Sequence, residues 1–126
     1  MKALLVALLL APLATLPAAE PLIHLAENGV ARHAIVIEAA ETATEAERFA
    51  AEELALFLLK ITGAAFPIMK EGEQTGPGIY VGHTRRATDA GVDHGKLGEE
   101  DWVLLTAGED LILTGGRPRG TLYAVY

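Results

Sequence analysis

The clearest candidate for ligand chemistry is the glycine-rich turn Gly115–Thr121, which carries two arginines. A short apolar run precedes the turn and apolar residues follow it, which is typical of a strand, a tight turn and the start of a helix. Free amides and the helix dipole at such a start favour anions, and arginine side chains add positive charge. The sequence therefore gives a candidate binding site for an anion or an acidic sugar at Arg117, Arg119, Gly120 and Thr121.

The same turn also has a purely structural interpretation. The spacing from Gly115 to Gly120 is that of a phosphate-binding P-loop, but the expected lysine is missing and Thr121 follows Gly120 directly. Glycines also serve where a strand turns tightly into a helix, because they allow positive φ angles and close packing. We favour this structural interpretation over ligand binding.

The four histidines, His24, His33, His83 and His94, match no metal site. His83 and His94 share a polar stretch with Asp89 and Asp93, but the spacing fits no metal-binding pattern and the chain has no cysteine. His24 lies between two apolar residues, where strand alternation would place it on the wet face. We predict ordinary loop polarity, with no metal and no cofactor.

No catalytic residue can be assigned in this stretch. Glu52 and Glu53 are adjacent on a predicted helix and point about 100° apart, which does not suit a pair flanking one glycosidic bond. The run Glu99–Asp101 is typical of a solvated loop, and the absence of serine and cysteine excludes the usual nucleophilic triads. Trp102 could stack on a sugar ring, but we favour the start of a buried strand for it.

One long helix is the clearest element that could position these residues. Thr44 and Glu47 form a capping-box pattern, and Gly63 is a C-cap after Thr62. Apolar residues outside the main stripe indicate that something beyond residue 126 covers a second flank. The predicted buried stripe is Ala46, Ala50, Leu54, Phe57, Leu58 and Ile61, and the apolar residues outside it are Phe49, Leu56 and Leu59.

The other elements are short, and together they predict an α+β fold. Asn28-Gly29 is a turn signal that would join the first two runs as a hairpin. The last two runs are continuously apolar, which favours strands covered on both faces. We expect a mixed sheet of roughly five or six strands with two principal helices. The predicted strands are Leu22–Leu25, Ala34–Ile37, Phe66–Met69, Ile79–Val81, Trp102–Leu105 and Leu111–Leu113, with a short helix over Thr84–Ala90.

Residues 1–19 have the pattern of a secretory signal peptide. Lys2 gives a positive start, the run Ala3–Leu16 is largely apolar, and small residues lead to a cleavage point near Ala19. The run is shorter than the ~20 apolar residues of a membrane-spanning helix. We therefore predict cleavage, no stable membrane anchor, a secreted or periplasmic location, and a mature domain over residues 20–126.

Composition limits the partners of that domain. The chain has 17 acidic and 10 basic side chains and a formal net charge of −7, which repels nucleic acid and anionic membrane surfaces. The length after the leader suffices for one domain with one core. The absence of cysteine means that export brings no disulfide framework.

The order of several short motifs resembles the N-terminal domain of bacterial alpha-glucuronidases and related glycoside hydrolases. The domain is also similar to domain 2 of the beta-N-acetylhexosaminidases, the small α+β domain that precedes their barrel. The resemblance covers nearly all of residues 22–126. The motifs are Ala50–Leu54, Leu59–Gly63 with Pro67-Ile68 after it, Ile79–Gly82, Leu111–Gly116 and Arg119–Tyr126.

This resemblance implies a catalytic (β/α)8 barrel after residue 126 that carries the carboxylate pair. The present stretch would then be a non-catalytic domain of a secreted hydrolase acting on polysaccharide, with glucuronic acid removal from xylan side chains as the expected activity. A rival hypothesis is a free-standing secreted domain that binds carbohydrate or an anion at the glycine-rich turn. A third is a periplasmic interaction domain without a ligand.

Overall fold

The computed structural model describes residues 12, 14, 16, 22–39 and 41–126 of the chain. Apart from three isolated positions, the predicted signal peptide over residues 1–19 lies outside the described residues, so it stays a prediction. Within the part of the chain that is described, no helix has both the length and the apolar character needed to cross a membrane.

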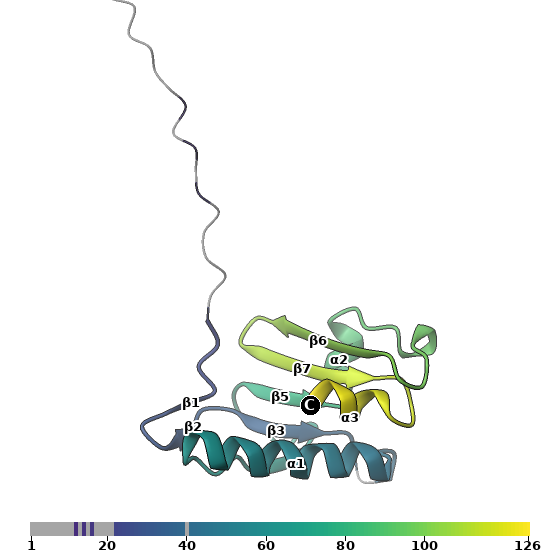
Figure 1. Cartoon of the computed structure of the whole chain (residues 1–126), viewed down its shortest axis with the longest axis horizontal. Coiled ribbons are helices and arrows are strands. Elements are labelled where there is room, and N and C mark those ends of the chain that lie inside the picture. Colours follow the sequence, from purple (N-terminus) through teal and green to yellow (C-terminus); the bar gives the residue numbers. More distant parts are fainter. Residues whose placement is uncertain (1–11, 13, 15, 17–21, 40) are drawn as a thin grey trace, which may run out of the picture.

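The described residues form a mixed sheet with helices, which confirms the predicted α+β fold (Figure 1). A five-stranded sheet has the order β4-β3-β5-β7-β6, and a separate two-stranded sheet pairs β1 with β2. The elements are β1 (Ala26–Glu27), β2 (Val30–Ala31), β3 (Ala34–Ile37), α1 (Glu45–Thr62), β4 (Ile68–Lys70), β5 (Gly78–Val81), α2 (Arg85–Asp89), the 3₁₀ helix η1 (His94–Lys96), β6 (Trp102–Ala107), β7 (Asp110–Gly115) and α3 (Gly120–Val125).

Four strands of the large sheet run parallel and one runs antiparallel. β3 pairs in parallel with β4 and β5, and β5 pairs in parallel with β7, with Ile79 opposite Leu111. β6 returns beside β7 as the predicted hairpin, with Leu104 opposite Leu113. The carboxyl ends of β3, β5 and β7 therefore meet at one edge of the sheet.

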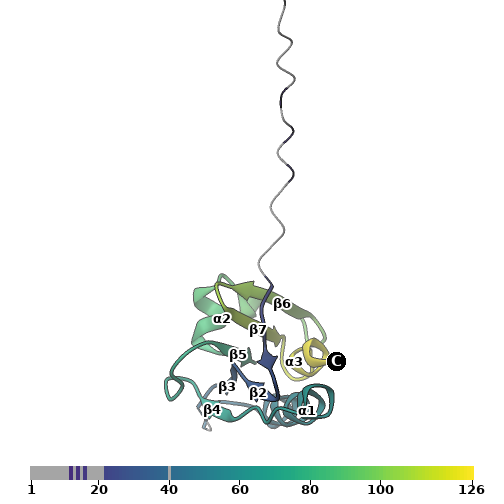
Figure 2. The same ribbon diagram turned by 90° about the vertical axis from the view of Figure 1, so that its left-hand side faces the viewer.

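Helices cover the two faces of this sheet unequally. Figure 2 shows α1 and α3 on one side of the sheet and α2 on the other. The core under α1 and α3 contains Ile35, Ile79 and Leu113, whereas Val36 and Ile112 belong to the core under α2. Alternate residues of each strand thus enter opposite cores, as strand geometry requires.

The helix α1 begins and ends as predicted. The Thr44 side chain accepts from the Glu47 amide and the Glu47 carboxylate accepts from the Thr44 amide, which completes the capping box. Gly63 closes the helix with a positive φ of 73°. The predicted buried stripe is partly wrong, because Phe57 and Ile61 are exposed while Glu47 is buried. The buried side of α1 is therefore rotated toward Glu47 relative to the prediction. A pattern of apolar residues could not predict the burial of this charged residue.

The predicted first hairpin is wrong in its partners. Residues 22–25 form no strand, and β1 pairs with β2 instead of with β3. Asn28 and Gly29 have φ angles of 51° and 74°, a tight turn that reverses the chain at once. β3 is therefore left free to enter the large sheet.

The prediction that both faces of the last two strands are covered is wrong for β6. β6 is the outermost strand of the sheet, and its burial alternates along its length. Trp102 is 58% exposed and Leu104 is 55% exposed, so Trp102 does not begin a buried strand. Sequence could not show this, because the alternation arises from the edge position of β6 and not from its apolar residues.

Candidate functional site

The carboxyl edge of the parallel strands brings the predicted turn together with residues from two other strands. Glu38 follows β3, His83 follows β5, and Arg117 follows β7. In open sheets with parallel strands, ligands bind beyond these carboxyl ends. This edge is therefore the candidate functional site.

Arg117 lies at the centre of this edge and is held by two carboxylates. Its Nε donates to Glu47 Oε1 at 2.9 Å, and its Nη2 donates to Glu47 Oε2 at 3.2 Å and to Glu38 Oε2 at 3.1 Å. A further bond of 3.2 Å reaches the carbonyl oxygen of Thr42. The guanidinium thereby joins the β7–α3 turn to the end of β3 and to the start of α1.

Glu47 is the buried partner in this group. Burial raises its pKa, but hydrogen bonds from Arg117 and from the Thr44 amide outweigh burial, and the net pKa lies below its ordinary value. The carboxylate therefore stays ionised at neutral pH. Its two oxygens serve both the capping box and the arginine, so Glu47 acts as a structural anion.

Arg119, the second arginine of the turn, points to a different carboxylate. Its Nη2 lies 2.6 Å from Glu100 Oε1, and both side chains are more than half exposed. An exposed pair of this kind contributes little to stability because water screens it. The structure thus places the two arginines of the predicted site with separate acidic partners.

The glycines of the turn are required by close packing. A Cβ on Gly116 would overlap the carbonyl oxygen of Gly98, and a Cβ on Gly120 would overlap that of Asp101. The Gly116 amide donates to Asp101 O at 2.9 Å, and the Gly120 amide donates to Gly116 O at 2.7 Å. Amides that an anion would need are therefore already used within the protein.

The four predicted binding residues are adjacent in space but differ in access. Arg117 and Arg119 are exposed and paired, while Gly120 and Thr121 are buried. The Thr121 hydroxyl is buried without a hydrogen-bond partner among the described residues. Anion binding at this turn stays a prediction, and both of its cations already have carboxylate partners.

A stacked histidine pair lies beside the turn, and sequence reasoning missed it. The rings of His83 and His94 stack with centroids 3.9 Å apart. His83 Nε2 donates to Gly115 O at 2.7 Å, and His94 Nε2 lies 2.9 Å from Thr114 Oγ1. Burial, followed by the neighbouring His83, lowers the pKa of His94. His83 binds Gly115 and His94 binds Thr114, so both rings are held at the end of β7, and spacing along the chain gave no signal.

The aspartates that sequence grouped with this pair do not join it. The Asp93 carboxylate accepts from the Gly95 amide at 3.1 Å, and Asp89 is exposed. Across the residues that the structure describes, no group of three or more His, Cys, Asp or Glu side chains could hold a metal ion.

A shallow groove of about 440 Å³ lies next to the edge. Glu38, Glu71, His83 and Arg85 are among the residues that line it. The Glu71 carboxylate accepts from the amides of Arg85 and Arg86, both at 2.8 Å, at the start of α2. The acidic groups of this groove thus hold chain segments in place, as Glu47 does.

The adjacent carboxylates that the sequence analysis considered, at residues 52–53 and 99–101, do not act as pairs in the structure. The Glu53 carboxylate accepts from the Tyr126 hydroxyl at 3.2 Å, and Glu52 is exposed. Asp101 Oδ2 accepts from the Gly98 amide at 2.7 Å. Their bonds fix loops and a helix end.

Comparison with known proteins identifies the family. No curated protein matches the chain. The family model described as "Glycosyl hydrolase family 67 N-terminus" matches residues 22–126, which is most of the chain. This agrees with the resemblance carried by the motifs of α1, β5, β7 and α3. The chain therefore belongs to the family of glycosyl hydrolase family 67 N-terminal domains.

Proposed function

We propose that this chain is the non-catalytic N-terminal domain of a secreted alpha-glucuronidase-like glycoside hydrolase, which removes glucuronic acid from xylan side chains. The family match over residues 22–126 is the observation that carries the proposal. Family membership implies a catalytic domain as partner in the full protein. The substrate, the export and the non-catalytic role are the parts that experiment must test.

The charge arrangement at the carboxyl edge supports a non-catalytic role. Hydrolysis of a glycosidic bond needs one carboxyl group with a raised pKa to act as acid and a second carboxylate across the bond. Glu47 has a lowered pKa, and Arg117 lies between it and Glu38. The Arg117 guanidinium opposes proton uptake by the buried Glu47 and also binds Glu38, so this arrangement is suited to structure.

These contacts suggest a structural role in fixing the β7–α3 turn. Arg117 fastens the last turn of the domain to α1 and to β3, and the glycines hold that turn against the loop at residues 98–101. A turn held in this way gives α3 a fixed direction at the end of the domain. A rigid domain would brace the catalytic domain and help to shape one wall of its cleft.

The test is to assay the protein encoded by the complete gene on glucuronoxylan oligosaccharides. We expect release of glucuronic acid, with kcat retained within about twofold in Glu38→Gln and Glu52→Gln. Absence of glucuronic acid release by the unmodified protein would overturn the hydrolase assignment.

The variants test the non-catalytic role separately. Removal of a general acid or base lowers the rate by about 10²- to 10⁴-fold. A loss of that size in folded Glu38→Gln, with Glu52→Gln unaffected, would show that this domain takes part in the chemistry. Circular dichroism confirms that both variants fold.

A further inference from the structure

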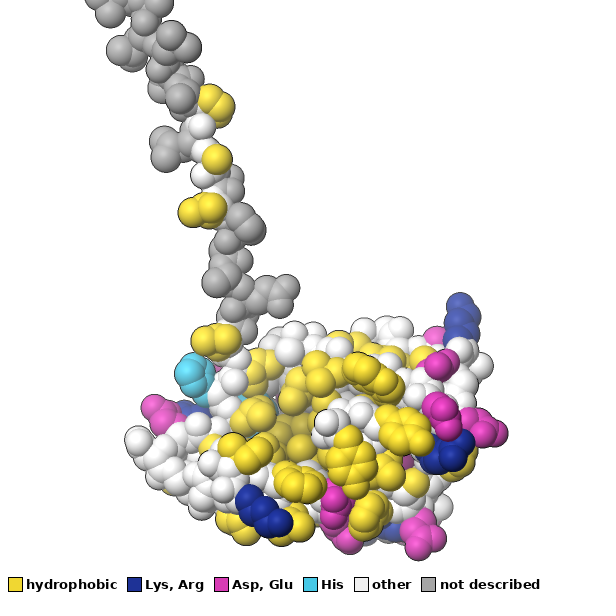
Figure 3. Space-filling view, in the orientation of Figure 1, with side chains coloured by type: hydrophobic (Ala, Val, Ile, Leu, Met, Phe, Trp, Pro, Cys, Tyr) yellow, Lys and Arg dark blue, Asp and Glu magenta, His cyan; other side chains and the backbone are white. Residues whose placement is uncertain are grey.

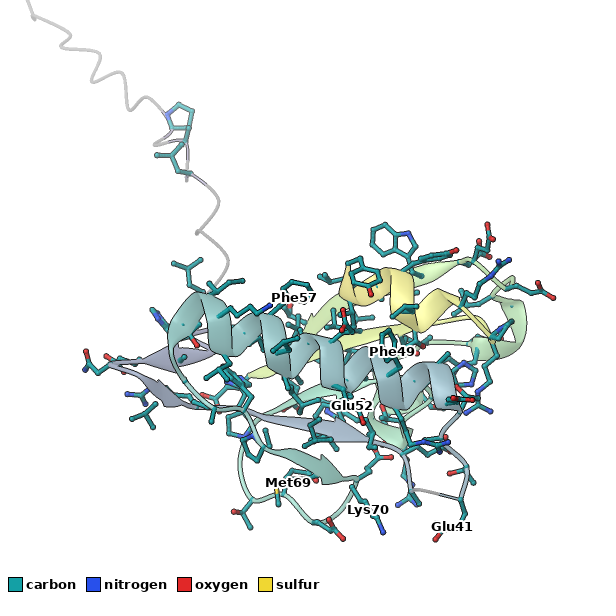
Figure 4. The ribbon with its side chains drawn as sticks, turned by 60° about the horizontal axis from the view of Figure 1, so that its bottom comes forward. Glu41, Phe49, Glu52, Phe57, Met69 and Lys70 are labelled. Carbon is teal, nitrogen blue, oxygen red and sulfur yellow. The ribbon has the colours of Figure 1, made fainter. Side chains whose placement is uncertain are left out.

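The starts of the parallel strands also meet at one edge of the sheet, opposite the carboxyl edge. His33 precedes β3, Pro77 precedes β5 and Glu109 precedes β7, so the strand order brings these three residues together. Figure 4 shows the β1–β2 hairpin at this end of the molecule, where α1 finishes. We call this end of the sheet the amino edge.

A cavity of about 750 Å³ lies at the amino edge. This volume falls within the range of about 300–1,000 Å³ that is typical of small-molecule sites. Its apolar lining includes Leu22, Ile23 and Pro77, and polar side chains complete it. Figure 3 shows this end of the molecule on the left, where a histidine and charged side chains lie beside apolar ones.

Hydrogen bonds between separate segments fix the walls of this cavity. The Ala34 amide donates to Pro77 O at 3.3 Å, and the Gly78 amide donates to Asp110 Oδ1 at 2.9 Å. Asp110 is held in turn by Arg86 Nε, which donates to its Oδ2 at 2.8 Å. The walls are therefore in place before a ligand binds, which lowers the entropy that binding must overcome.

His33 lines the cavity and is buried with one ring nitrogen unpaired. Only 6% of the residue is exposed. Its Nε2 lies 2.8 Å from Glu109 O, and because a carbonyl oxygen can only accept, Nε2 donates. Nδ1 of the neutral ring is then an acceptor, and it has no partner among the described residues. Buried polar groups almost always have a partner, so Nδ1 indicates a missing hydrogen-bond donor.

The charged groups of the cavity restrict the class of ligand that could supply this donor. Glu27 and Glu109 provide two carboxylates, whereas Arg32 provides one guanidinium, which already binds Glu27. This excess of negative charge, in a chain of formal net charge −7, disfavours an anion. The carboxylate of Glu109 has no partner among the residues that the structure describes, so it too can accept from a ligand.

The two acceptors lie at different depths in the cavity. His33 is buried and Glu109 is exposed, so a single ammonium group is poorly suited to serve both. A sugar ring carries several hydroxyl donors, and its C–H faces can pack against the apolar lining. A short neutral oligosaccharide therefore matches the volume, the charge and the acceptors of the cavity.

We propose that the cavity at the amino edge binds a neutral oligosaccharide, with one hydroxyl donating to Nδ1 of His33 and another donating to Glu109. The ligand class follows from the cavity itself. The choice of a xylo-oligosaccharide as probe rests on the proposed function, because an enzyme that acts on xylan side chains meets neutral xylose units.

The absence of cysteine from the chain allows a fluorophore to be placed beside the cavity. Thr75→Cys carries the label on an exposed loop position, two residues before Pro77. Thr88→Cys carries it on α2, at an exposed position that lines the groove beside the carboxyl edge. Both variants are made in the protein encoded by the complete gene, with any cysteines outside this domain replaced by serine. The measurement is the change in fluorescence during titration with xylotriose.

We expect a saturable change from the label at Thr75→Cys and none from the label at Thr88→Cys. Adding His33→Phe to Thr75→Cys should raise the Kd for xylotriose at least about tenfold, because the buried acceptor is lost. No change at Thr75→Cys, or equal changes at the two labels, would overturn the proposal.

Competition tests the class of ligand. Neither glucuronate nor putrescine should displace xylotriose at concentrations about tenfold above its Kd. Displacement by glucuronate would assign the cavity to an acid, and displacement by putrescine would assign it to an amine. Either result rules out a site for neutral sugars.

A second pair of variants keeps the test decisive if His33→Phe fails to fold. Glu109→Gln, on the exposed turn, should raise the Kd at least about threefold, because an amide oxygen is a weaker acceptor than a carboxylate. Glu99→Gln, exposed on another loop, should leave the Kd unchanged. An unchanged Kd in Glu109→Gln contradicts the proposal.

Glucuronic acid release is measured separately on the unmodified protein. A protein that binds xylotriose beside Thr75→Cys but releases no glucuronic acid would refute the proposed function and leave the sugar site standing. Release of glucuronic acid without a change in fluorescence would refute the sugar site alone.

Discussion

The glycine-rich turn and the outer surface of α1, α3 and β6 are neighbouring parts of one domain. The polar groups of the turn have partners within the protein, whereas the aromatic side chains of that surface are largely exposed. At the turn, two arginines have carboxylate partners, and glycines sit against backbone carbonyls. On α1, α3 and β6, five of the seven aromatic residues of the sequence are each more than a third exposed. The residues that resemble a ligand site therefore make contacts within the protein that hold the turn in place. Apolar residues of the kind expected in a core are instead exposed at the surface.

The largest effect should come from the closest packing in the turn. Gly116→Ala would place a Cβ into the carbonyl oxygen of Gly98, so the loop and the turn must separate. We expect a loss of about 3 kcal/mol in the free energy of unfolding, the upper range for overpacking. Urea denaturation measures this loss.

Gly95→Ala is the matched control for that change. A Cβ there meets only Asp93 Oδ1, at 3.3 Å, and the loop is exposed. It should cost less than about 1 kcal/mol. Equal losses at the two glycines would mean that the turn is not held by close packing.

Arg117 should give the next largest effect. Arg117→Met leaves the buried Glu47 carboxylate without its cation and releases Glu38 from the turn. Breaking a buried pair costs about 3–5 kcal/mol, and the partial exposure of Arg117 reduces this to about 2 kcal/mol. Chemical denaturation of the single variant checks the value.

A double-mutant cycle with Glu47→Gln sharpens this prediction. Gln keeps the capping-box geometry but removes the charge that Arg117 neutralises. The loss in the double variant should be clearly smaller than the sum of the two single losses. Additive losses would mean that the two side chains do not stabilise the turn together.

The stacked histidines predict a pH dependence of smaller size. The pKa of His94 in the folded state lies below its ordinary value of 6.5, through burial and the neighbouring His83. The unfolded chain therefore binds the proton first, and stability falls as the pH drops from about 6.5 toward the folded pKa. Glu47 and Asp93 favour the proton on His94, while Arg117 and His83 oppose it.

His94→Gln should reduce this loss, measured as the slope of unfolding free energy against pH between pH 7 and 5. Lys96→Gln, an exposed change on the same 3₁₀ helix, should leave the slope unchanged. An identical slope in wild type and His94→Gln would mean that His94 does not control it.

Local signals predicted much of the fold, and contacts between distant residues account for what they missed. The Thr44 capping box, the Gly63 C-cap and the β6–β7 hairpin depend on neighbours within a few residues, so sequence predicted them correctly. The bond between Arg117 and Glu47 joins residues 70 apart, and only strand order brings them together. The exposure of Trp102 likewise follows from the edge position of β6.

Substitution of Arg119 should have the smallest effect on the free energy of unfolding, which contrasts with the effect of substituting Arg117 in the same turn. Its partner Glu100 is exposed, so Arg119→Ala should change the free energy of unfolding by no more than about 0.5 kcal/mol. Salt should reduce even this difference, because exposed charges are screened. Urea denaturation at low and high salt, beside Arg117→Met, makes the comparison. A loss as large as that of Arg117→Met would show that the exposed and the buried ion pair stabilise this turn equally. The burial of Glu47 would then not explain the contribution of Arg117 to the free energy of unfolding.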